Sequence, residues 1–171
     1  MTDTRDVVST SSTDEQRTTD GGNPGVAVEE AVRQALALVD TWIGWDGRPR
    51  VGEDGDRIYT PHKAVRRIAD HLVDHLAEVE AQLAGVETQP DGWHGSLLTF
   101  ESDWARFTEG DRDEAHQRLP RLARTFALRL AAAGPQEWDR PRGDGWTLRE
   151  IAAHLTGVLW YAEQVGRLAP Q

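Results

Sequence analysis

Cysteine is absent from the 171-residue chain, and lysine occurs only once, at Lys63. A chain without cysteine has no disulfide framework, no thiolate zinc site, no iron–sulfur cluster and no cysteine nucleophile. Any metal must therefore be held by imidazole and carboxylate groups. Any thiol chemistry needs a thiol that is supplied from outside the chain.

Basic charge and long apolar runs are also scarce. The 19 Lys and Arg residues are outnumbered by 29 Asp and Glu residues, which gives a formal charge of -10 and disfavours a nucleic-acid partner, because phosphate binding needs a basic face. No apolar run approaches the roughly 18 residues that a membrane span needs, and the N-terminus lacks the apolar core of a signal peptide. We expect a cytoplasmic protein that acts on a small-molecule substrate and has no nucleic-acid or membrane partner. The sequence does not determine the oligomeric state, and a homodimer is one possibility.

The length fits one domain, with or without a tail. Residues 1–24 are rich in Ser, Thr, Asp and Gly and offer almost nothing to bury, which predicts a disordered N-terminal tail. The remaining residues 25–171 form the predicted domain.

Apolar residues recur at three- and four-residue steps in four long segments. Thr60 followed by Pro61 is typical of a helix start, and Gly85 is typical of a helix end. Thr147 and Glu150 have the spacing of a capping box at the start of another helix. We see no credible strand pattern, so the fold class predicted is an all-α four-helix bundle. The helices are expected at about 26–43, 61–85, 111–133 and 147–168, with a short helix around 97–107.

Three of the six histidines are placed to meet inside such a bundle. His71 and His75 are four residues apart, on one face of their helix and beside its apolar stripe. His154 occupies a similar position on the last helix. In catalytic metal sites, three protein ligands commonly leave a fourth coordination position of the metal open for substrate or water. We therefore take His71, His75 and His154 as the candidate metal ligands.

A structural interpretation of the same residues stays open. An H-x-x-x-H pair on a helix is often solvated or hydrogen-bonded, and position 72 is Leu, which excludes the H-E-x-x-H motif of metalloproteases. The other histidines, the carboxylates near the pair and the acidic loop at 52–57 are expected to be surface groups, although the carboxylates can also orient imidazoles. These residues are His62, His94, His116, Asp70, Asp74, Glu78, Asp54 and Asp56.

The last helix and the turn before it carry a more specific pattern. Trp138 is followed by Gly145-Trp146-Thr147, then Arg149-Glu150-Ile151 and His154-Leu155. This resembles the W-turn and G-W-T-x-R-E-I-x-x-H-L helix of the DinB/YfiT-like superfamily. The segment KAVRRIADHLVDHLAEVEAQLAG is similar to the later H-x-x-x-H helix of the same superfamily, through His71 and His75.

The resemblance implies a four-helix bundle in which His71, His75 and His154 hold a divalent metal, most often nickel or zinc. Relatives in the superfamily include thiol S-transferases that use bacillithiol or mycothiol, and a mycothiol-dependent maleylpyruvate isomerase. The resemblance therefore implies a metal-dependent transferase, or a related lyase or isomerase, with an external low-molecular-weight thiol as co-substrate.

The order of the two motif helices is reversed in this chain. The superfamily places the W-T-x-R-E-I-x-x-H-L helix first, whereas here it follows the H-x-x-x-H helix, which indicates a circular permutation joined through residues 86–110. The general base is left open among Glu150, Tyr161 and Glu163. The alternative function is a non-catalytic helical bundle that acts as a binding or dimerisation module.

Overall fold

A computed structural model describes residues 21–53, 55, 57–89 and 97–168. The chain is mostly helical, which confirms the all-α prediction. Most of the predicted N-terminal tail lies outside the described residues, as do His94, Asp54 and Asp56.

Helix α1 spans Gly25–Val39, directly after Pro24. The Asn23 side chain accepts a hydrogen bond from the Gly25 N–H and donates one to the Ala127 carbonyl at 2.9 Å, which fixes the start of α1 against a later helix. A Cβ on Gly25 would lie 2.5 Å from Ala127 Cα, so glycine permits this close approach. The helix ends before the predicted Ile43, because Thr41 donates its hydroxyl to the Leu38 carbonyl in a turn.

Helix α2 spans Pro61–Ala84 and has the predicted boundaries. The Thr60 hydroxyl accepts from the Lys63 N–H, and Gly85 ends the helix with a φ of 68°, in the left-handed region that favours glycine. Before α2 lies a short antiparallel hairpin of β1 (Arg50–Val51) and β2 (Ile58–Tyr59). The expectation of no strands is wrong here, because two residues per strand are too few to show an alternating pattern.

Helix α3 spans Glu109–Ala133 and begins with a capping box between Thr108 and Asp111. It continues on both sides of Pro120. In place of the short helix expected at 97–107, the structure has a 3-10 turn, η2, at Glu101–Trp104. After α3, helix α4 (Pro135–Trp138) is a single turn that the sequence did not predict. The buried indole of Trp138 donates to the Leu130 carbonyl at 2.8 Å and pins this turn.

The predicted fourth helix is two helices, α5 (Leu148–Leu155) and α6 (Val158–Val165). Thr147 and Glu150 form the predicted capping box at its start. The break occurs at Thr156 and Gly157, whose N–H groups bond three residues back, to the carbonyls of Ala153 and His154. The Thr156 hydroxyl also bonds the Ala153 carbonyl, and these tighter turns end the α-helix there.

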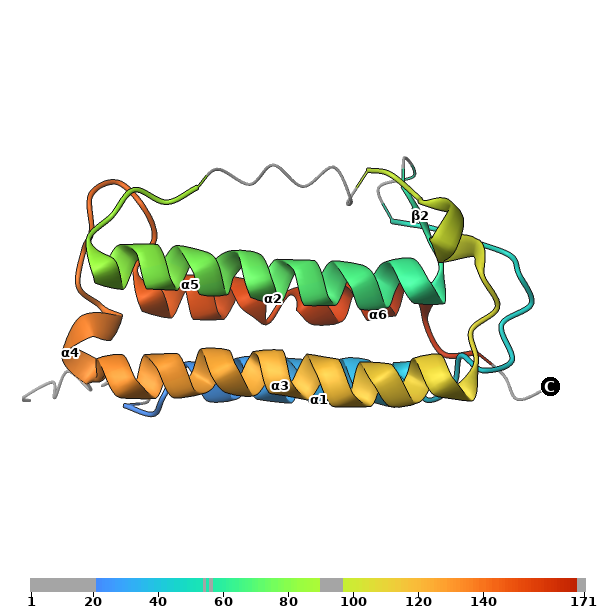
Figure 1. Cartoon of the computed structure of the whole chain (residues 1–171), viewed down its shortest axis with the longest axis horizontal. Coiled ribbons are helices and arrows are strands. Elements are labelled where there is room, and N and C mark those ends of the chain that lie inside the picture. The colour runs from blue at the N-terminus through green and yellow to red at the C-terminus, as the bar shows by residue number, and fades with distance from the viewer. Residues whose placement is uncertain (1–20, 54, 56, 90–96, 169–171) are drawn as a thin grey trace, which may run out of the picture.

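The helices pack in two layers, as Figure 1 shows: α2 lies beside α5 and α6, and α3 lies beside α1. The predicted apolar stripes meet between the layers, which removes their side chains from water and stabilises the fold by roughly 2 kcal/mol for a large aliphatic residue. Core residues from each long segment include Val28, Val32, Val39, Ile68, Leu72, Val79, Leu119, Phe126, Leu130, Ile151, Leu155 and Val158. Among the described helices, none is both long and apolar enough to cross a membrane.

Candidate metal centre

The three candidate histidines come from two helices that pack together. His71 and His75 lie one turn apart on α2, and His154 lies near the end of α5. Their rings form a compact cluster, with centroids 4.7 Å apart for His71 and His75 and 4.9 Å apart for each of the other two pairs.

The ring nitrogens converge. One nitrogen from each of the three histidines lies within 4.8 Å of the others, and the Nε2 atoms of His71 and His154 are 3.0 Å apart. Nitrogens that share an ion at ~2.1 Å lie roughly within 4 Å of one another, so small rotations of the side chains suffice. The three histidines are therefore close enough to hold one metal ion.

A carboxylate fixes the orientation of His75. Its Nδ1 lies 2.7 Å from Glu78 Oε2, and only 12% of the His75 side chain is exposed. With Nδ1–H donated to Glu78, the lone pair of His75 is on Nε2 and is available for a metal, as in many carboxylate–histidine–metal arrangements. The helical spacing of three residues places Glu78 on the same face as His75.

Gln82 extends this arrangement to the loop before α5. Its Nε2 donates to the Trp146 carbonyl at 3.1 Å and approaches Glu78 Oε1 at 3.4 Å. Gln82 thus ties α2 to the residue whose ring covers His154, at a centroid distance of 4.7 Å. Gln82 was not among the residues predicted from the sequence, although its position two helical turns after His75 places it on the same face.

A cavity of about 300 Å³ opens beside the histidines. A small ligand in this cavity can therefore reach all three imidazoles. The cavity is lined by the three histidines together with Asp74, Glu78, Thr88, Gln89 and Trp146.

The electrostatic environment keeps His154 neutral. Partial burial of its ring, and then the neighbouring His75, lower the pKa of His154 from its ordinary value, while Glu78 acts in the opposite direction. A lowered pKa means that the imidazole is unprotonated at pH 7 and has the lone pair that a metal ligand needs.

Of the three candidate general bases, Tyr161 is the one that the structure brings to the histidines, with its ring 5.8 Å from that of His71. Glu150 is engaged at the start of α5, where its carboxylate accepts from the backbone N–H and the hydroxyl of Thr147. Glu163 is exposed on α6 and makes no hydrogen bond or ion pair among the described residues.

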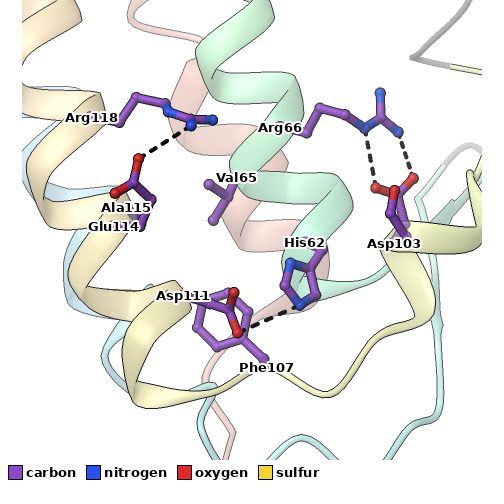
Figure 2. Close-up of a pocket in the computed structure, with 10 residues that line it drawn as sticks. His62, Val65, Arg66, Asp103, Phe107, Asp111, Glu114, Ala115 and Arg118 are labelled. Carbon is purple, nitrogen blue, oxygen red and sulfur yellow. Dashed lines mark hydrogen bonds and ion pairs between the residues drawn. The ribbon is translucent and has the colours of Figure 1, made fainter.

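The other described histidines lie apart from this cluster. His116 pairs with Asp40 at 2.7 Å on the surface. His62 lines a second cavity, of about 330 Å³, between α2 and α3. Figure 2 shows that its charged side chains are paired with each other: Arg66 with Asp103, Arg118 with Glu114, and His62 with Asp111 at 3.9 Å. Within the described part of the chain, the His71–His75–His154 cluster is the one group with a metal-ligand arrangement.

In comparisons with known proteins, no protein-family model, no curated protein and no solved structure matches the chain.

Proposed function

We propose that the chain is a DinB-like four-helix bundle, with its two halves in permuted order, that binds one divalent metal through His71, His75 and His154. The single observation that supports this most is the approach of His71 and His154, which are 83 positions apart in sequence. A chance H-x-x-x-H pair on one helix would have no reason to face a third imidazole from another.

The permuted order is compatible with the site because packing, and not chain order, brings the ligands together. Helix α5 and the three residues before it carry the G-W-T-x-R-E-I-x-x-H-L motif, and α5 packs against α2, which carries the H-x-x-x-H pair. Joining the halves through residues 86–110 leaves that pairing of helices unchanged.

The donor set fits the metals that the resemblance implies. Neutral imidazoles suit zinc and nickel, whereas calcium and magnesium prefer oxygen ligands. A bound divalent ion there supplies Lewis acidity, which lowers the pKa of a thiol or a water molecule that reaches its open position.

The side chains around the cluster have separate roles in this proposal. Glu78 holds the His75 ring, Trp146 covers one side of His154, and the adjoining cavity admits the substrate. The reaction proposed is transfer of an external low-molecular-weight thiol to an electrophile, or a related elimination or isomerisation. The thiol sulfur forms a bond to an electrophilic carbon, the leaving group departs with its electron pair, and the thiol proton passes to a base. The base proposed is Tyr161, whose ring lies 5.8 Å from that of His71.

Metal analysis of protein purified without a histidine tag tests the proposal. We expect stoichiometric nickel or zinc in the wild type and none in His154→Ala, with His116→Ala as the matched control that keeps its metal. A wild-type protein that neither contains nor takes up a divalent metal would overturn the proposal and favour the non-catalytic binding module.

A further inference from the structure

A third and larger cavity adjoins the candidate metal centre. It measures about 640 Å³ and shares two lining residues, Glu78 and Thr88, with the cavity beside the histidines. The end of α2 and the loop before α5, which supply its lining residues, lie at the same end of the molecule (Figure 1). Its walls are the last turns of α2, the segment up to Thr88, and residues 137–145.

Most charged groups of this cavity are already engaged. Arg142 donates to the Glu137 carboxylate and to the carbonyls of Glu137 and Arg140. Arg140 donates to the other oxygen of the same carboxylate at 3.2 Å. Glu78 is bonded to His75 and approached by Gln82. The two guanidinium groups therefore share one carboxylate, and the whole lining holds three carboxylates, Glu78, Glu87 and Glu137, against these two cations.

The groups without a partner are mainly acceptors. Among the described residues, Glu87 and Thr88 make no hydrogen bond or ion pair. Gln82 turns its amide nitrogen toward two acceptors, and its Oε1 is buried without a donor. The C-terminal end of α2, which carries partial negative charge, lies in the same wall. A ligand that donates hydrogen bonds and carries positive charge complements these groups, and an anion does not.

The two cavities also have the dimensions for one extended ligand. Gln82 follows His75 by seven residues, or ~10 Å along the helix at 1.5 Å per residue. A molecule with one end at the histidines must therefore have an arm of several bonds to reach Gln82 and Glu87.

We infer that the larger cavity is the binding site for the amine-bearing arm of a small-molecule substrate whose other end reaches the metal centre. This inference rests on the proposed function, because it places the reactive end at His71, His75 and His154. Glu87 is the specificity-determining residue, and Thr88 supplies a further hydrogen-bonding group.

Three six-carbon thiols that differ only at the far end test the inference: 6-amino-1-hexanethiol, 6-mercapto-1-hexanol and 6-mercaptohexanoic acid. Their binding to cobalt(II)-loaded protein is measured by calorimetry and by the thiolate-to-cobalt absorption band. We expect the aminothiol to bind at least ten-fold more tightly than the carboxylate thiol, with the alcohol between them. Glu87→Gln should reduce that preference at least three-fold, whereas Glu163→Gln, an equal change of charge on α6, should preserve it.

The outcomes separate the two proposals. A protein that takes up no cobalt overturns the proposed function and this inference with it. A cobalt-loaded protein that binds the three thiols equally, or that keeps its preference in Glu87→Gln, overturns this inference alone. Circular dichroism of both variants confirms that the fold is intact.

Discussion

The Nε2 atoms of His71 and His154 lie 3.0 Å apart, closer than two imidazoles approach unless they share a proton or a cation. In the metal-free protein, one nitrogen donates its hydrogen to the lone pair of the other. A metal ion would replace that proton and take both lone pairs. The same contact is thus a hydrogen bond without metal and would supply two of the three proposed ligands with it.

Replacing His154 should abolish metal binding and leave the fold unchanged. Its side chain is exposed at the surface end of the cluster, so His154→Ala should alter the free energy of unfolding of the metal-free protein by less than ~1 kcal/mol. We expect the metal dissociation constant to rise at least 100-fold in calorimetric titrations. An unchanged dissociation constant would exclude His154 as a ligand.

Glu78→Gln should weaken metal binding without removing a ligand. The glutamine keeps the side-chain volume but is neutral, so it orients and polarises the His75 ring less well. A loss of roughly 10- to 100-fold in metal affinity is expected. Glu163→Gln is the matched control, since it removes an equally negative, exposed side chain that does not line the cavity beside the histidines. A loss of the same size in both variants would contradict the role of Glu78.

Acidification should release the metal. A proton and a metal ion compete for the same imidazole lone pair, so loading falls as the histidines become protonated. Because the pKa of His154 is lowered, this histidine stays unprotonated, and able to bind a metal, at lower pH than an ordinary histidine. Metal content measured after equilibration between pH 7.5 and 4.5 checks this, and full loading at pH 4.5 would contradict imidazole ligation.

The lowered pKa of His154 also predicts the direction of a stability change in the metal-free protein. The folded state binds its proton less readily than the unfolded chain, in which the pKa is about 6.5. The unfolded state therefore gains protons first as pH falls, and stability decreases below about pH 6.5 and is unaffected above it. Urea unfolding of wild type and His154→Gln should show a smaller acid dependence in the variant; equal slopes would show that His154 does not contribute.

The close contact of α1 with α3 gives a prediction about the fold itself. A Cβ on Gly25 would lie 2.5 Å from Ala127 Cα, so Gly25→Ala must push the two helices apart. We expect a destabilisation of about 1–3 kcal/mol in urea unfolding. Gly21→Ala is the control, because nothing lies within 4 Å of its added Cβ. Equal stabilities would show that the helices do not meet as closely as described.

The helices were predictable because their signals are local. Thr60, Gly85 and Thr147 each bond groups within a few residues, and the boundaries they set agree with the structure. The break at Gly157 was not predicted, since the apolar spacing of the last helix continues across it. The hairpin at Arg50–Val51 and Ile58–Tyr59 was missed because its strands are too short for a pattern.

The candidate site was predictable in part. The spacing of His71 and His75 placed them on one face, the similar position of His154 on the last helix added the third histidine, and the family resemblance pointed to the same three residues. No local rule could show that Trp146 covers His154 or that Gln82 reaches the Trp146 carbonyl, because both contacts depend on how the loop before α5 folds over α2. The larger cavity is lined in part by the same loop and could not be predicted from the sequence either.

Anomalous diffraction from crystals of tag-free, zinc-loaded protein, collected at the zinc edge, tests the central claim most directly. We predict one strong peak between the three imidazoles, with nitrogens of His71, His75 and His154 at ~2.1 Å. A peak at any other group of side chains, or no peak at this cluster with zinc present in excess, would contradict it.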